Sequence, residues 1–197
     1  MLPSTLTANR FGRTTVATKH SIAPFPADID RAYFGAWLSG FTDGEGYFRL
    51  GFDNGLPVAR FSVCLRSDDV PVLHLIRSFL QCGSPVYDHK KVYGRKNRPT
   101  SINESPTSTY VVKDIESLHN VIVPHFTVYP LLAKKSNDFS IWSEAVVFLY
   151  VRSTIIRYDT RGRRHTGYHS WSSAQLHKFS TYVERLKEVR QFTREST

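Results

Sequence analysis

The sequence predicts an α+β fold in which a four-stranded antiparallel sheet carries helices on one face. Two pairs of strand-like segments, with apolar and polar residues in alternation, lie within 47–65 and 85–113. A segment with helical spacing of apolar residues precedes each pair, and further helical segments follow the second. This order separates antiparallel strands from helices, which is typical of the α+β class. The other face of such a sheet is open to a ligand.

The first helix is expected to begin near residue 30. Asp28 or Asp30 provides an N-cap for a helix over Ala32–Asp43. Gly44 and Gly46 are expected to end this helix and to lead into the first strand.

The first strand pair is predicted to be a hairpin. Tyr47–Phe52 and Val58–Leu65 both alternate, and Asp53-Asn54-Gly55 between them is a strong turn signal. The side chains expected to face the helices are Phe48, Leu50, Phe52, Ala59, Phe61, Val63 and Leu65.

The second helix and strand pair follow the same logic. Helical spacing begins at Asp68 and Gly83 closes it. The second strands are Pro85–Lys90 and Ser108–Lys113, and the long basic loop Lys91–Thr107 joins them. The residues expected on the open face are Arg49, Gly51, Asp53, Arg60, Ser62, Asp88, Lys90, Thr109 and Val111.

Three further helices are expected in the C-terminal half. Asp114 caps a short one through Val121, a second runs from Leu131 or Ser136 to Tyr150, and Ser172–Phe192 is amphipathic. The chain has 197 residues, of which 41% are hydrophobic, and this size fits one domain over 28–197.

Residues 1–27 form a basic N-terminal extension. They contain no acidic residue and are rich in Thr and Ser, which resembles an organellar transit segment and predicts a mitochondrial or chloroplast location. A flexible basic tail explains the same composition.

The net charge predicts a polyanionic partner. Lys and Arg number 26 against 17 Asp and Glu, which gives a formal charge of +9 and favours nucleic acid. The longest apolar run, Ala145–Val151, is far shorter than the roughly 18 residues of a membrane span, so no membrane is expected. Two isolated cysteines, Cys64 and Cys82, favour a reducing compartment without a disulfide framework or a zinc site.

Two carboxylates at the end of the first helix predict a cation site. Asp43 and Glu45 stand where the helix dipole is negative and the last carbonyls lack helical partners. Carboxylate and carbonyl oxygens are ligands suited to Mg²⁺, and the neighbouring glycines let another backbone or DNA approach closely. A solvated acidic helix end is an equally good interpretation of the spacing alone.

Small residues along the same helix predict a close helix partner. Gly35 and Ser39, and likewise Ala36 and Gly40, form two overlapping pairs at a spacing of four. Such a ridge permits a short distance between helix axes. Packing of the helix on its own sheet is the alternative.

The segment Leu38–Gly46, LSGFTDGEG, resembles the signature that names the LAGLIDADG family of homing endonucleases. Phe61–Leu65 followed by Asp69 is similar to the second strand and helix of that family, and Pro124–Phe126 with Tyr129–Lys135 is similar to a later block. The resemblance covers about residues 30–150. It implies an intron-encoded, site-specific endonuclease that hydrolyses both strands of a long DNA site with a divalent metal.

The resemblance also assigns roles. Glu45 corresponds to the catalytic acid that binds the metal, and Asp43 to a supporting acid in the same centre. Lys135, or alternatively Lys134, corresponds to the active-site lysine that organises water around the scissile phosphate. Leu65 stands where some members carry a polar glutamine. The expected metal is Mg²⁺, with Mn²⁺ as a substitute and Ca²⁺ binding without supporting cleavage.

A single signature predicts a homodimer on double-stranded DNA. The helices carrying Gly35, Ala36, Ser39 and Gly40 would pair across a two-fold axis, and the target would be near-palindromic. The residues expected to contact DNA are Arg49, Arg60, Ser62, Arg66, Asp88, Lys90, Thr109, Arg95, Lys96 and Arg98.

The same residues are compatible with other functions. An RNA-binding maturase that assists intron splicing is the main alternative, and a DNA-binding regulator with a degenerate nuclease fold is less favoured because the acidic and lysine positions are intact. His165 and His169 lack neighbouring metal ligands. The basic segment Arg157–His165 is either a phosphate-contacting or a solvated loop. His119 and His125 are interpreted as structural.

Overall fold

The computed structural model describes residues 21–89, 106–154, 156–158, 164–166 and 171–191. Its centre is a four-stranded antiparallel sheet in the order β1-β2-β4-β3, which confirms the predicted class. The strands are β1 at Gly46–Asp53, β2 at Leu56–Arg66, β3 at Tyr87–His89 and β4 at Thr107–Val112. β1 is therefore an edge strand, and β2 lies in the middle of the sheet.

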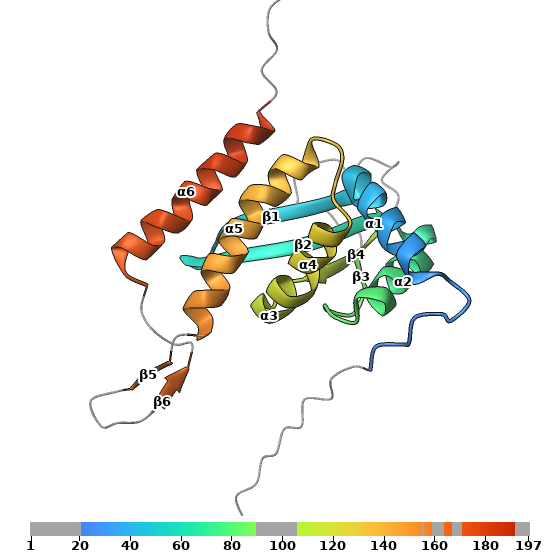
Figure 1. Ribbon diagram of the computed structural model, residues 1–197, viewed down its shortest axis with the longest axis horizontal. Coiled ribbons are helices and arrows are strands. Elements are labelled where there is room, and N and C mark those ends of the chain that lie inside the picture. Colours follow the sequence, from blue (N-terminus) through green and yellow to red (C-terminus); the bar gives the residue numbers. More distant parts are fainter. Residues whose placement is uncertain (1–20, 90–105, 155, 159–163, 167–170, 192–197) are drawn as a thin grey trace, which may run out of the picture.

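The main helices cover one face of this sheet (Figure 1). In that view α5 crosses β1 and β2, and α6 lies beside α5 near one end of β1, while α1 and α2 lie at the opposite end. The helical bounds are α1 at Arg31–Glu45, η1 at Ser67–Asp69, α2 at Val70–Leu80, α3 at Ile115–Ser117, η2 at Leu118–Ile122, α4 at Val123–Val128, α5 at Lys135–Thr154 and α6 at Ser173–Arg190. No helix of the described ranges is both long and apolar enough to span a bilayer.

The first helix ends two residues later than the sequence predicts. Asp30 is its N-cap and accepts a hydrogen bond from the Tyr33 N–H at 2.6 Å. Gly44 remains helical, and Gly46 takes an extended backbone and donates its N–H to the Thr42 carbonyl. A Cβ at Gly46 would lie 2.4 Å from the Thr42 side chain, so only glycine fits this exit. Glu45 is consequently the last helical residue.

Two other elements differ from the expected pattern. The helix capped by Asp114 does not stop at Val121 but continues through a π-helical turn and α4 to Val128. Pro124 lies at the start of α4, directly after the π-helical turn, and the altered hydrogen-bond pattern of that turn accommodates the missing N–H of the proline. A hairpin of β5, Ile156–Tyr158, and β6, Arg164–Thr166, replaces the expected loop, because strands this short carry no readable alternation.

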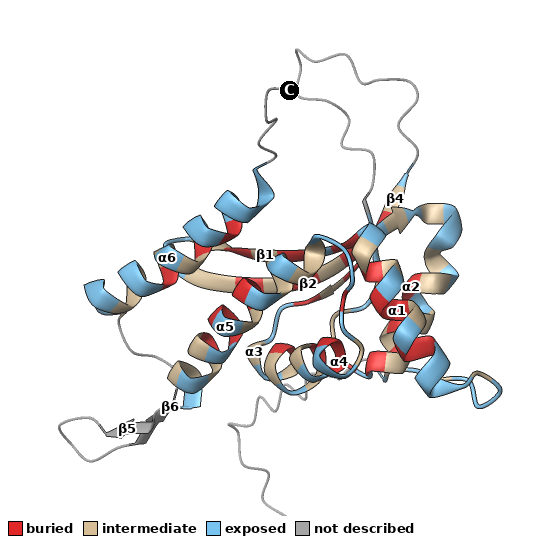
Figure 2. Cartoon of the chain, turned by 45° about the horizontal axis from the view of Figure 1, so that its top comes forward, coloured by how far each residue is buried: buried red, intermediate tan, exposed pale blue. Residues whose placement is uncertain are grey.

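The core lies between the sheet and the helices, as the buried segments of Figure 2 show. Phe48 and Phe61 face each other in the register of β1 and β2, and both are fully buried. Their rings contact Phe126, and Phe48 also contacts Trp142. The predicted inner faces of β1 and β2 are thus confirmed, except that Phe52 is 38% exposed, with its ring against that of Phe179.

Part of the predicted N-terminal extension packs against the helices. The Phe25 ring lies 5.1 Å from Phe34 of α1 and 5.2 Å from Phe79 of α2. The Gln81 side chain donates a hydrogen bond to the Ala23 carbonyl at 3.0 Å. Residues 21–27 therefore belong with the domain, and residues 1–20 lie outside the described part.

His125 predicts a pH dependence of stability. It is buried among the rings of Phe79, Phe126 and Tyr129, and burial lowers its pKa from 6.5 to about 4. The unfolded chain takes up this proton near pH 6.5 and the folded protein only near pH 4. The stability that His125 contributes above pH 6.5 is therefore lost as the pH falls through this window, by roughly 2–3 kcal/mol at pH 4.5.

His125→Phe should remove this component, because the phenyl ring fits an aromatic site and does not titrate. Urea unfolding of both proteins at pH 7 and pH 4.5 measures it. An equal loss of stability in the two proteins would contradict the assignment.

Candidate active site and nucleic-acid interface

Lys135 connects the start of α5 to the end of α1. Its Nζ donates hydrogen bonds to the carbonyl of Gly44 at 3.1 Å and to that of Gly46 at 2.6 Å. These carbonyls lie where a helix end leaves acceptors without helical partners. Of the two lysines left open by the sequence, Lys135 is the one that reaches this helix end, while Lys134 is exposed.

Asp43 holds the segment that leads to Lys135. Its Oδ2 accepts hydrogen bonds from the N–H groups of Leu132 at 2.9 Å and Ala133 at 3.1 Å. Charge-assisted bonds of this kind are stronger than neutral ones. Asp43 thus holds the segment that leads to Lys135. This contact is a positioning role, whereas the resemblance implies a supporting acid of the same centre.

Glu45 lies beside this lysine and is exposed to solvent. Burial of the half-exposed Lys135 ammonium lowers its pKa, and the carboxylates of Asp138, Asp43 and Glu45 oppose this shift. The negative end of α1 therefore combines an exposed carboxylate with a partly dehydrated cation. The partly dehydrated Lys135 ammonium would attract a phosphate more strongly than a fully hydrated ammonium does.

A cavity of about 310 Å³ adjoins these residues. Arg190 of α6 forms part of its wall, binds Asp138 at 2.7 Å and donates to the Phe48 carbonyl at 2.5 Å. No motif in the sequence indicates Arg190, because this residue of α6 joins the site through tertiary packing alone. The residues around the cavity are Asp43, Ala133, Lys134, Lys135, Asn137, Asp138, Val189 and Arg190.

The donor set suits a divalent metal only in part. Among the described residues no three His, Cys, Asp or Glu side chains converge. The Gly44 and Gly46 carbonyls already accept from Lys135, so the strong oxygen ligands at this helix end are the exposed Glu45 carboxylate and the buried Oδ1 of Asp43, which has no hydrogen-bond partner in the described part of the chain. Mg²⁺ is commonly held by one or two carboxylates together with substrate phosphates. Glu45 fits that pattern, provided that the substrate or a second chain supplies the other ligands.

The helix-free face of the sheet carries arginines, as predicted. Arg49 and Arg60 stand directly opposite each other on β1 and β2 and point away from the core. Ser62 follows on the same face opposite Tyr47. Arg66 is exposed at the end of β2 and pairs with Asp68 at 2.5 Å.

Two of the predicted DNA contacts differ from the expectation: Asp88 lies on the other face of the sheet, and Thr109 is buried. Asp88 pairs in register with Ser108, accepts a hydrogen bond from its hydroxyl at 2.5 Å and therefore lies on the helix side. The error came from the alternation assumed for β3, which is only three residues long. Thr109 does face the open side through its pairing with Cys64, but it is only 6% exposed. The predicted contacts Lys90, Arg95, Lys96 and Arg98 lie outside the described residues.

The small-residue ridge of α1 divides into two sides. A Cβ at Gly35 would lie 2.6 Å from the Tyr129 ring, and the Ser39 hydroxyl donates to the Tyr129 carbonyl at 2.6 Å. Gly35 and Ser39, predicted for the dimer interface, therefore pack against Tyr129 within the chain. Ala36 and Gly40 are exposed, and a Cβ at Gly40 would meet nothing within 4 Å.

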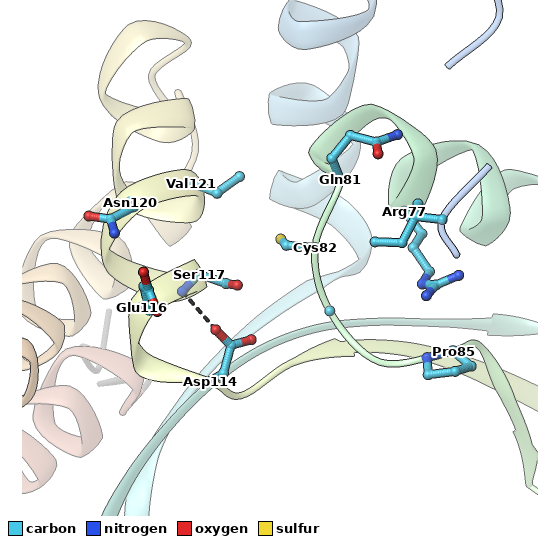
Figure 3. Close-up of a pocket in the computed structure, with 11 residues that line it drawn as sticks. Arg77, Gln81, Cys82, Pro85, Asp114, Glu116, Ser117, Asn120 and Val121 are labelled. Carbon is cyan, nitrogen blue, oxygen red and sulfur yellow. Dashed lines mark hydrogen bonds between the residues drawn. The ribbon is translucent and has the colours of Figure 1, made fainter. Parts of the chain in front are cut away.

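A larger cavity, of about 630 Å³, lies away from this site between the end of α2 and the start of α3 (Figure 3). Cys82 is at its wall, and burial raises the pKa of its thiol to about 11. A thiol that stays protonated is a poor nucleophile. His119 stacks on Tyr150 with ring centroids 3.8 Å apart, and these contacts fit the structural role expected of His119 and of the buried His125.

Comparison with known proteins identifies relatives of this architecture. The model of a family described as LAGLIDADG endonuclease matches residues 38–146. A probable intron-encoded endonuclease 2 of Neurospora crassa is 28% identical over 121 residues, which are 56% of this chain and 23% of that protein. An uncharacterized 50.9 kDa protein in ND4 intron 1 of Podospora anserina is 30% identical over 122 residues, 57% of this chain and 24% of that one. The chain thus spans about a quarter of the length of these relatives.

Solved structures show the same fold. The homing endonuclease I-SmaMI bound to cleaved DNA superposes with a TM-score of 0.57 at 18% identity, over 80% of this chain and 45% of that one. The homing endonuclease I-TnaI gives a TM-score of 0.54 at 20% identity, over 82% of this chain and 96% of that one. At these identities the likeness shows a shared architecture and leaves the site to be argued from its own residues.

Proposed function

Because the chain belongs to the LAGLIDADG endonuclease family, we propose that it is one subunit of a site-specific endonuclease that cuts both strands of a long DNA site. The observation that carries this proposal is the meeting of Glu45 and Lys135 at one end of α1, next to the sheet face with Arg49 and Arg60. A polyanion lying on that face would bring its backbone to the helix end. The formal charge of +9 favours such a partner.

Each residue then has a definite task. Two of the three N–H donors of Lys135 bind the Gly44 and Gly46 carbonyls, which leaves one for a phosphate oxygen or a water molecule beside it. Its fixed charge would stabilise the charge that develops on the phosphate during hydrolysis. Glu45 would present its exposed carboxylate to a divalent cation, and Asp43 keeps the lysine segment in place.

We propose Mg²⁺ as the cation, with Mn²⁺ as a functional substitute and Ca²⁺ as a non-catalytic one. When bound, such an ion lowers the pKa of a coordinated water and offsets charge on the leaving oxygen. The role of this chain is to supply the Glu45 oxygen ligand at a helix end whose dipole favours cations.

A homodimer would complete the centre. Ala36 and Gly40 form an exposed small-residue strip on α1, and Tyr33 on the same side is 72% exposed. Leu132, next to the Asp43 anchor, is 90% exposed. Pairing of two such strips would cover apolar surface and bring the two Glu45 carboxylates together, on a target with two-fold symmetry.

The relatives support the setting of this activity. One is named as an intron-encoded endonuclease and the other as a protein in an intron. We therefore propose that the chain is encoded in an intron and acts in an organelle. The maturase alternative is not favoured, because the named activity of the first relative is nuclease activity.

Selection from a randomised DNA library tests the proposal. With Mg²⁺, the protein should cut both strands of sites whose two halves are related by symmetry, and EDTA should stop cleavage. Tight binding of selected sites without any cleavage in Mg²⁺ or Mn²⁺ would refute the nuclease assignment. Preferential binding of structured RNA over every DNA duplex would instead favour the maturase.

A further inference from the structure

Asp53 connects the two arginines on the open sheet face, at the hairpin end of β1 and β2. Its Oδ1 accepts a hydrogen bond from Arg49 at 3.1 Å, and its Oδ2 accepts one from Arg60. One carboxylate therefore binds two guanidinium groups, with a separate oxygen for each.

The hairpin geometry places Asp53 for this task. Asp53 lies four residues after Arg49 on β1, so both side chains point to the same face. The turn behind it contains Asn54 and Gly55 with φ of 50° and 77°, the conformation of a tight two-residue hairpin turn. This short turn pairs Leu56 with Asp53 and places Arg60 opposite Arg49, and both arginine side chains reach along the same face to the Asp53 carboxylate.

The Asp53 carboxylate reduces the electrostatic repulsion between the two arginines. Arg49 and Arg60 are direct cross-strand partners, and like charges in that position repel. The three side chains remain between 34% and 40% exposed, so water screens their attraction and the network adds little to stability. Its greater effect is on the direction in which the arginine N–H donors point toward a ligand.

Each guanidinium keeps donors for that ligand. Arginine carries five N–H donors in a planar fork, and the contact to Asp53 engages one terminal nitrogen of each. An arginine fixed at one end can still direct its other donors to a guanine edge, which is the commonest specific contact in the major groove. An arginine without such an anchor can instead bind phosphate oxygens, and these contacts carry no sequence information.

We propose that Asp53 is a specificity-determining positioning residue, which orients Arg49 and Arg60 toward base edges and offsets part of their charge toward phosphates. This inference rests on the proposed DNA-binding function. It goes beyond that function because it assigns sequence discrimination to an acidic residue on a basic face.

Asp53→Asn tests the proposal, because asparagine keeps the size and the turn preference while losing the charge. Binding to a selected target and to random duplex is measured by fluorescence anisotropy in Ca²⁺ at several salt concentrations. Random-duplex affinity should rise roughly fivefold to tenfold at 0.1 M salt, and the slope of log K against log salt should steepen by about 0.9. The ratio of target to random affinity should fall at least roughly fivefold, the low end of one bidentate base contact.

Glu144→Gln is the matched control. Glu144 also pairs with an arginine, Arg185 at 2.8 Å, but on the helices α5 and α6, and its change adds the same net charge. It should leave the affinity ratio unchanged, and thermal melting should show both variants folded. An unchanged ratio in Asp53→Asn, or an equal fall in Glu144→Gln, would overturn the role of Asp53. If the wild-type protein itself fails to discriminate, the proposed function fails instead.

Discussion

Replacing Glu45 by glutamine is expected to abolish DNA cleavage while leaving DNA affinity within about threefold. The carboxylate is exposed at the end of α1 and forms no part of the hairpin arginine network. Glutamine keeps its size but is a poor ligand for a hard cation. Loss of one centre of charge stabilisation in an active site typically costs about 10²–10³ in rate, and loss of the metal should exceed this. Single-turnover cleavage in Mg²⁺ and anisotropy in Ca²⁺ measure the two effects.

Asp43→Asn provides a comparison at the neighbouring acid. It weakens the bonds from the Leu132 and Ala133 N–H groups, and this should lower the melting temperature and reduce cleavage only partially. Glu45→Gln should leave the melting temperature unchanged. Cleavage by Glu45→Gln at the wild-type rate would remove Glu45 from the metal site.

Gly40→Leu should dissociate the proposed dimer without harming the monomer. A side chain at Gly40 meets nothing within 4 Å, and replacing a glycine in a helix interior gains up to about 1 kcal/mol of helix stability. Two leucines at a close helix crossing would cost several kcal/mol, roughly a 100-fold rise in the dimer dissociation constant. Sedimentation equilibrium measures the expected weakening of the dimer, and thermal melting at low concentration measures the expected gain in monomer stability. Cleavage should fall together with dimer formation.

Gly35→Ala is the control with the reverse pattern. Its Cβ would meet the Tyr129 ring at 2.6 Å, so it should destabilise the monomer by roughly 1–3 kcal/mol and leave the dimer constant of the folded protein unaffected. A Gly40→Leu protein that dimerises like wild type would show that the exposed strip is not the interface.

The order of elements was readable because local signals and tertiary structure agree in this chain. Asp30 caps α1 and Asp114 caps α3, as their side chains predict. The alternation of β1 and β2 gives the correct buried face, since eight and eleven residues are long enough to show a period of two. β3 has three residues, and there the same reasoning put Asp88 on the wrong face.

The site was predictable only in part for a similar reason. Glu45 and Lys135 follow from two short motif blocks, Leu38–Gly46 and Tyr129–Lys135, each of which is continuous in the sequence. The division of the α1 ridge does not, because the contact of Gly35 and Ser39 with Tyr129 joins residues about 90 positions apart. Arg190 and the bridge from Asp53 to two arginines likewise exist only after packing.

The ties between α1 and residues 129–135 have a consequence for recombination between relatives. Tyr129 fills the space at Gly35 and binds Ser39, Asp43 receives two backbone N–H groups of the segment, and Lys135 closes the helix end. These contacts join the segment to one side of the helix along three turns. In a chimera of two such proteins, the two stretches would have to be inherited from the same parent. A crossover between them would combine Lys135 with Gly44 and Gly46 carbonyls from a different parent, whose positions need not match the lysine.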